Sequence, residues 1–180
     1  MPLPKRTEIR IAGLGGQGVV LAGHILGKAA VHDGLQVVQT QSYGAEARGS
    51  AAKSEIILSD GRIGFPMVRK SDVLVAMSQT ALDKHLRDLK ETGTLIVDTD
   101  TIKGVPSTSA KVFKVDAAKK AETELKSRMY ANMVMLGAIV KITRLVTNSA
   151  VEKAIQETFS GEAADKNITA FKAGLDLVRS

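Results

Sequence analysis

Residues 9–18 read Ile-Arg-Ile-Ala-Gly-Leu-Gly-Gly-Gln-Gly, and this stretch decides the fold that we expect. An apolar strand, Ile9–Ala12, leads into a glycine loop, Gly13–Gly18, and a helix-compatible run, Gln17–His32, leads out of it. Strand, glycine loop and helix in this order are typical of the G-x-G-x-x-G turn that binds phosphate groups. The sequence therefore predicts a phosphate-bearing ligand at this loop. The alternative is that the glycines serve only tight packing.

Each glycine of the loop has an expected role in such a turn. Gly13 allows the tight turn, Gly15 lets a phosphate approach the backbone, and Gly18 lets the helix lie close to the sheet. The first N–H groups of the helix lack intrahelical partners and lie at its positive end, which favours an anion.

The composition is typical of one globular domain spanning residues 1–180. Apolar residues make up 44% of the chain and aromatic residues only 3%, so the core must be aliphatic. There is no cysteine, which excludes disulfides and any iron–sulfur cluster or zinc site that uses thiolates of this chain. A chain without cysteine fits a reducing cytoplasm, the location that we expect.

The charge pattern argues against nucleic acid as a partner. The net charge is +6, but basic residues are spread among carboxylates, and the four Phe and two Tyr are not interleaved with a basic cluster. Met1–Thr7 has no apolar signal-peptide core, and the longest apolar run, Met133–Val140, is too short to span a bilayer. We therefore expect neither secretion nor membrane insertion.

Apolar runs along the chain alternate between strand and helix patterns, which predicts an α/β fold. We expect a single Rossmann-like domain with a mostly parallel sheet, helices on both faces, a short hairpin near residue 60 and a helical C-terminal third. The first helix and Leu35–Val38 should complete a right-handed βαβ unit. Further strands are predicted at 51–59, 73–77, 94–97 and 111–115, a hairpin turn at 60–61 leading to 62–63, and helices at 79–91, 130–146, from 149 and at 163–178.

Caps and helix glycines carry more specific expectations. Ser78 and Asp116 should cap the helices that follow them, and Ser149–Glu152 reads as a capping box. Gly23 and Gly27, four residues apart in the first helix, indicate close approach of another backbone.

The helix predicted at Tyr130–Val146 is apolar almost all round, so it should be buried in the core or at an interface. In a domain of this size we expect a partner subunit on one side of it. Asn132 is expected to be a capping or buried structural amide.

A free-standing nucleotide-binding protein or NAD-dependent enzyme is the weaker alternative. The dinucleotide fold places Asp or Glu about 20 residues after the glycines to hold the ribose. This sequence has Gln39-Thr40-Gln41 there, and no Gly-Lys-Ser/Thr follows the loop, so it is not a Walker A motif either.

A second candidate loop, Gln41–Ser50, is small, polar and rich in glycine. Arg48 can bind a phosphate or carboxylate with two N–H groups, Glu46 can orient Arg48, and Tyr43 can close over a ligand. An Arg48–Glu46 surface pair in a structural loop explains the same residues equally well.

Other polar residues are expected to be structural. Asp98-Thr99-Asp100 follows a strand and favours a turn, because Asp bonds its own backbone in turns. His24, His32 and His85 lack partners at metal-ligand spacing. We predict no metal site, and the residues form no recognisable catalytic set.

Three segments together resemble one family, the gamma subunit of 2-oxoacid:ferredoxin oxidoreductases, almost from end to end. The first is the loop G-x-G-G-Q-G. The second is Ser-Tyr-Gly-x-Glu-x-Arg-Gly, and the third is Asn-Met-x-x-Leu-Gly-Ala. The matching residues are Gly13, Gly15, Gly16, Gln17 and Gly18; then Ser42, Tyr43, Gly44, Glu46, Arg48 and Gly49; then Asn132, Met133, Leu136, Gly137 and Ala138. Gln39–Gln41 is similar to the 2-oxoglutarate branch, while Ser50 replaces a usual glycine and should stiffen the loop slightly.

The resemblance implies that this chain is inactive alone. Such enzymes convert a 2-oxoacid and coenzyme A to acyl-CoA and CO₂ and pass electrons to ferredoxin. Thiamine diphosphate and the iron–sulfur clusters are expected on the other subunits. The expected partners are alpha and beta subunits, with a delta subunit and a homodimer of the isolated chain left open. The residues of the first two motifs are then expected to face coenzyme A or the thiamine-bearing region. A pure assembly scaffold is the remaining alternative.

Overall fold

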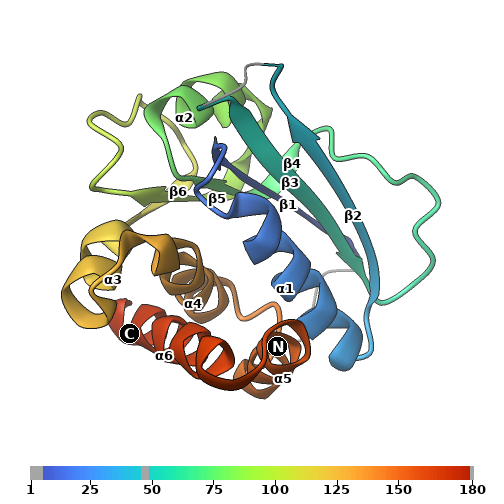
Figure 1. Ribbon diagram of the computed structural model, residues 1–180. Coiled ribbons are helices and arrows are strands. Elements are labelled where there is room, and N and C mark those ends of the chain that lie inside the picture. Colours follow the sequence, from blue (N-terminus) through green and yellow to red (C-terminus); the bar gives the residue numbers. More distant parts are fainter. Residues whose placement is uncertain (1–5, 46–48, 179–180) are drawn as a thin grey trace.

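The computed structural model describes residues 6–45 and 49–178, and their elements form one α/β layered domain. Six strands and their intervening helices follow the alternation that the sequence predicts (Figure 1). In chain order they are β1 (Arg6–Leu14), α1 (Val19–His32), β2 (Gln36–Tyr43), β3 (Ala51–Ser59), β4 (Ser71–Ala76), α2 (Gln79–His85), η1 (Leu86–Asp88), β5 (Leu89–Asp98), β6 (Lys111–Val115), α3 (Ala117–Leu125), η2 (Arg128–Tyr130), α4 (Ala131–Thr143), α5 (Asn148–Thr158) and α6 (Gly161–Leu177).

The strands form one sheet in the order β2-β3-β1-β4-β5-β6. The pairs β1–β4, β4–β5 and β5–β6 are parallel, whereas β3 runs antiparallel to both β1 and β2. The mostly parallel sheet is thus confirmed. β1 and β2 run in the same direction, because each is antiparallel to β3, so the predicted βαβ unit is present, with β3 inserted between its two strands.

Helices cover both faces of the sheet, as predicted, but unequally (Figure 1). Alternate residues of each strand serve the two cores: Val73 and Val75 face the large core beneath α1, α4 and α6, and Leu74 faces the small core. The small core is closed by Leu82 of α2 and by Ile102. The carboxyl ends of β1, β4 and β5 therefore open between two helical layers.

Helix α4 is buried by its own chain. Every residue from Ala131 to Val140 is buried, against α1, α3 and α6. The approach of α6 is close, because a Cβ at Gly174 would lie 1.9 Å from the carbonyl oxygen of Val134, and one at Gly137 would lie 2.1 Å from that of Phe171. The apolar surface of α4 is therefore no evidence for a partner subunit, and that argument is wrong.

Several predicted boundaries also differ. Residues 60–70 form an irregular connection without the expected hairpin strand. The helix predicted to reach residue 91 ends at His85, because Leu89 already pairs with Ser71 in the sheet. Ser78 caps α2 as expected, with its Oγ accepting the Ala81 N–H at 3.2 Å.

Two predicted caps are not formed. The side chain of Asp116 makes no capping hydrogen bond. Helix α5 is capped by Thr147, which accepts the Ala150 N–H, rather than by the box at Ser149. In the described part of the chain, no helix has both the length and the apolarity to cross a membrane.

Candidate functional site

The glycine loop turns sharply after β1, and Gln17 braces it. Gly16 and Gly18 have φ angles of 91° and 71°, which side-chain-bearing residues rarely adopt. The Gln17 Oε1 atom accepts the Leu14 N–H at 2.6 Å, and its Nε2 donates to the Met77 carbonyl at 2.7 Å. A Cβ at Gly13 would lie 2.4 Å from that Oε1 atom. Gly13 therefore makes room for the brace, and Gly16 rather than Gly13 makes the turn.

The three sequence motifs meet at this loop. The Gly15 N–H donates to the Ser50 carbonyl at 2.7 Å, which joins the first motif to the second. The Asn132 Nδ2 donates to the Gly18 carbonyl at 3.3 Å, and its Oδ1 accepts the Met133 N–H, as expected of a buried structural amide. The nearest atoms to a Cβ at Gly18 belong to Asn132, so Gly18 admits α4 rather than the sheet.

The start of α1 keeps unused hydrogen-bond donors. Among the residues that the structure describes, the N–H groups of Gly16, Gly18 and Val19–Leu21 have no hydrogen-bond partner. They border a cleft of about 460 Å³ whose lining also includes His24, Gln41 and Tyr43. N–H groups at the positive end of a helix attract an anion, so the geometry keeps the predicted anion site open.

The second loop is described only at its two ends. Ser42 and Tyr43 end β2, the Gly44 N–H donates to the Ala51 carbonyl at 2.6 Å, and Gly49 has a φ of 65°. Tyr43 is 62% exposed and lines cavities on both of its sides. Glu46 and Arg48 lie outside the described residues, so their expected pairing and ligand contacts stay predictions.

The surroundings of β2 differ from those of a nicotinamide-binding fold. The Gln39 Nε2 donates to Ser54 Oγ at 2.8 Å and to the Val20 carbonyl at 3.3 Å, which uses this amide in packing. Gly23 packs against the same Ser54 side chain, so the helix glycines approach side chains and not another backbone. Antiparallel β3 occupies the place beside β1, so β2, whose end would hold the ribose in a nicotinamide-binding fold, is displaced by one strand.

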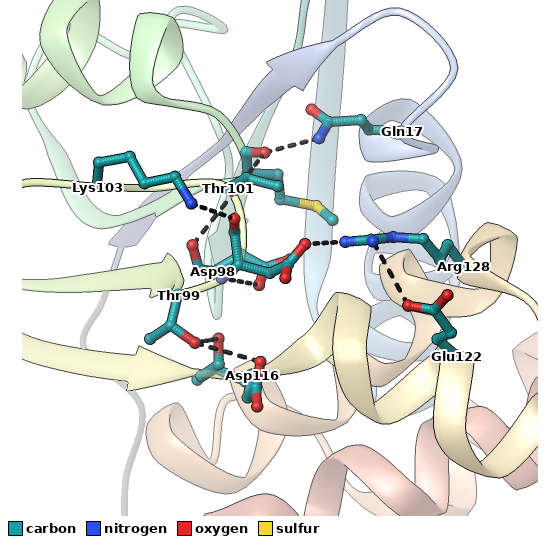
Figure 2. Close-up of polar contacts among 11 residues, drawn as sticks. Gln17, Asp98, Thr99, Thr101, Lys103, Asp116, Glu122 and Arg128 are labelled. Carbon is teal, nitrogen blue, oxygen red and sulfur yellow. Dashed lines mark hydrogen bonds and ion pairs between the residues drawn. The ribbon is translucent and has the colours of Figure 1, made fainter.

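Asp98 and its neighbours form a polar cluster that extends beyond the turn predicted at Asp98–Asp100 (Figure 2). The turn predicted at Asp98-Thr99-Asp100 is confirmed, because Asp98 Oδ1 accepts the Asp100 N–H at 3.2 Å. Asp98 is only 1% exposed, and burial raises the pKa of its carboxyl to about 6, against the lowering effect of the Ala118 and Ala117 N–H groups. The burial comes from α3, which the strand sequence alone does not reveal.

This cluster is joined to the glycine loop through one carbonyl. Figure 2 shows Thr101 and Gln17 directed to the same oxygen, that of Met77, at 2.9 and 2.7 Å. Arg128 pairs with Asp100 and, at 3.4 Å, with Glu122. A cavity between the loop and this cluster is lined by Gly16, Gln17, Asp98 and Arg128, among others.

The histidines play different parts. His32 pairs with Glu157 at 3.0 Å, and His24 borders the cleft at the start of α1. His85 is buried, and its burial, followed by the nearby Arg10, Lys53 and Lys84 charges, lowers its pKa to about 4. Within residues 6–45 and 49–178, no group of three or more His, Asp or Glu residues could hold a metal ion.

Comparison with known proteins agrees with this arrangement. The family model described as pyruvate ferredoxin/flavodoxin oxidoreductase matches residues 8–177. The chain belongs to this family. It is 47% identical to the 2-oxoglutarate synthase subunit KorC of Methanothermobacter marburgensis, over 96% of this chain and 97% of that protein.

Two solved structures have the same fold. The gamma subunit of a keto/oxoacid ferredoxin oxidoreductase from Geobacter sulfurreducens is 41% identical, with a TM-score of 0.83 over 94% of this chain and 96% of the other. A 2-oxoglutarate:ferredoxin oxidoreductase from Magnetococcus marinus has a TM-score of 0.87 at 23% identity, over 97% of this chain but 31% of that one, and this likeness shows the fold alone. This chain is thus a gamma-type subunit of a multi-subunit 2-oxoacid oxidoreductase.

Proposed function

We propose that this chain is the coenzyme A-contacting gamma subunit of a 2-oxoglutarate:ferredoxin oxidoreductase. The complex would convert 2-oxoglutarate and coenzyme A to the acyl-CoA and CO₂ and pass the electrons to ferredoxin. The observation that carries the contact is the set of unused N–H groups of Gly16, Gly18 and Val19–Leu21 at the start of α1. A phosphate is the ligand group that such donors hold best, because they are numerous, fixed and aligned with the helix dipole.

The second motif supplies the remaining contacts in this proposal. Arg48 precedes Ser50 by two residues in the chain, and the Ser50 carbonyl accepts the Gly15 N–H, so we propose Arg48 as the side chain that contacts the phosphate at this loop. Tyr43 borders the cleft and is exposed enough to pack against a ligand. Glu46 would orient Arg48, while Ser42, Gly44 and Gly49 shape the loop.

The cofactors of the chemistry are assigned to other subunits. The chain has no cysteine, so it offers no thiolates to an iron–sulfur cluster. We therefore place thiamine diphosphate and the clusters on the other subunits of the complex, which are alpha, beta and, as an open alternative, delta subunits, and we place the complex in the cytoplasm. The relative solved with 2-oxoglutarate, coenzyme A and succinyl-CoA bound supports the choice of ligands at the level of the shared fold.

The test is steady-state kinetics of the whole complex carrying Arg48→Ala. A charge-assisted hydrogen bond to a phosphate contributes about 1.5–3 kcal/mol, so the KM for coenzyme A should rise at least tenfold. Arg87→Ala, which removes the same charge from an exposed position in η1, should leave this KM unchanged. An unaltered KM and turnover in Arg48→Ala would remove the role given to this residue.

A pure scaffold is the second candidate, because the three motifs also bond to one another through Gly15, Ser50, Gly18 and Asn132. It predicts that substitutions at the loop weaken assembly of the complex and leave the KM for coenzyme A unchanged in the complexes that form. Size-exclusion chromatography of the variant complexes, followed by kinetics on the assembled fraction, separates the two.

A further inference from the structure

A second cavity lies on the α2 side of the site. It has a volume of about 160 Å³, and we call it the α2 pocket. Its walls come from the ends of β1 and β2, the start of β3 and one side of α2. The lining residues are Gly13, Leu14, Ser42, Tyr43, Gly44, Ala51, Ala52, Lys53, Thr80, Ala81, Lys84 and His85.

The charges around this pocket are mostly positive. Among the described residues that line it, none is acidic and two are lysines. Lys53 pairs with Glu55 at 3.1 Å, whereas Lys84 makes no ion pair with any residue that the structure describes. Lys84 therefore has an ammonium group available for a ligand.

The pKa of His85, which lines the pocket, is lowered by the same positive charges. Apart from burial, the charges that lower its pKa are those of Arg10, Lys53 and Lys84, and only Asp88 acts in the other direction. With a pKa of about 4 the ring is neutral at pH 7, so it can donate one N–H without adding charge. The hydroxyl group of Thr80 is a further donor in the lining.

The α2 pocket adjoins the cleft at the start of α1. Leu14, Tyr43 and Ala52 line both cavities, so the two cavities are adjacent. A ligand with two anionic groups joined by a short linker could place one on each side of Tyr43. Coenzyme A has this chemistry, because its diphosphate and its 3′-phosphate are separated by one ribose.

We propose that the α2 pocket binds the 3′-phosphate of coenzyme A, with Lys84 as the principal ligand and Lys53 in support. This inference rests on the proposed function, since it takes the diphosphate to lie at the start of α1. It assigns the pocket the role of distinguishing coenzyme A from its analogue without the 3′-phosphate. The apolar lining residues Leu14, Ala51, Ala52 and Ala81 would exclude water from the bound phosphate.

The experiment compares coenzyme A with 3′-dephospho-coenzyme A as substrates of the whole complex. In the complex with Lys84→Gln, kcat/KM for coenzyme A should fall about tenfold, while kcat/KM for the dephospho analogue should change less than twofold. Lys84→Arg keeps the charge and should recover much of the loss. Lys153→Gln, at an exposed position of α5, removes the same charge elsewhere and should change neither value.

Three results would overturn the proposal. The first is a wild-type complex that uses the two substrates equally well. The second is a Lys84→Gln complex that loses activity equally with both, because the loss would then be unrelated to the 3′-phosphate. The third is a change confined to the KM for 2-oxoglutarate, which would assign the pocket to a carboxylate.

The same substrate pair separates this proposal from the function on which it rests. Arg48→Ala should impair both substrates alike, because both carry the diphosphate. If Arg48→Ala has no effect but Lys84→Gln discriminates between the substrates, the pocket stands and the loop contact fails. If Arg48→Ala raises both KM values and Lys84→Gln does not discriminate, the loop contact stands and the pocket fails.

Discussion

The contact between α4 and α6 allows a stability prediction in which one substitution has opposite effects at two sites. Alanine is favoured over glycine in a helix by about 1 kcal/mol. At Gly174 the added Cβ would lie 1.9 Å from the Val134 carbonyl oxygen and 2.8 Å from its carbon. These are backbone atoms of a buried helix, so the two helices must separate to admit it.

Overpacking of this kind costs about 1–3 kcal/mol, and the backbone clash places Gly174→Ala at the upper end. After the gain in helix propensity, the free energy of unfolding should fall by about 2 kcal/mol. For a chain of 180 residues this corresponds to a Tm lower by about 4–8 °C.

Gly27→Ala in α1 is the matched control. There the nearest atom to the added Cβ is Val37 Cγ1 at 3.4 Å, an ordinary van der Waals contact. This variant should be more stable than wild type by about 0.5–1 kcal/mol. Thermal and urea unfolding followed by circular dichroism would measure both. A Gly174→Ala protein as stable as wild type would refute the argument that α4 and α6 pack too closely for a Cβ. A destabilised Gly27→Ala protein would refute the inference that α1 has room for a Cβ at this position.

The remaining predictions concern buried polar groups. The pKa of Asp98 is raised to about 6, so the stability that its protonated form contributes is complete below the unfolded pKa of 3.8 and is lost as the pH rises through 6. The pKa of His85 is lowered from 6.5 to about 4, so this residue makes stability rise with pH over the same range. Urea titrations between pH 4 and 7 should therefore show stability rising with pH in Asp98→Asn and falling in His85→Gln, each by about 3 kcal/mol, and parallel profiles would contradict both assignments. Asn132→Ala leaves the buried Met133 N–H without its acceptor and should lower the free energy of unfolding by about 1–3 kcal/mol, as chemical denaturation would show, while the Gly18 carbonyl keeps the Ala22 N–H. If that variant also leaves the KM for coenzyme A of the complex unchanged, Asn132 does not help to position the start of α1.

Local sequence patterns predicted the helices and strands better than they predicted which strands pair with one another. The bounds of β3 and β6 agree with the predicted strands, because each is a short apolar segment bounded by turn residues. The place of β3 between β1 and β2 could not be read, since strand pairing depends on contacts that periodicity does not encode. Leu89 illustrates the limit: it continues the helical spacing of Leu82 and Leu86, yet pairing with Ser71 draws it into β5.

The candidate site shows the same division. The motifs correctly indicated the glycine loop and the structural amide of Asn132, and the structure brings both together with Ser50. Neither the raised pKa of Asp98 nor the positive pocket around His85 has a signal in the sequence. Both depend on which helix covers a side chain, and this is decided by the tertiary fold.

The burial of α4 within its own chain bears on how such a protein can be inherited. A domain whose hydrophobic core is formed entirely by its own residues can be encoded by a separate gene or as one segment of a longer gene product. Neither arrangement requires additional core contacts with another chain. The solved structure from Magnetococcus marinus, in which this fold makes up only 31% of the chain, has the second arrangement. Fusion or separation of this unit would then change the local concentration of its partners, while the hydrophobic interior stays the same.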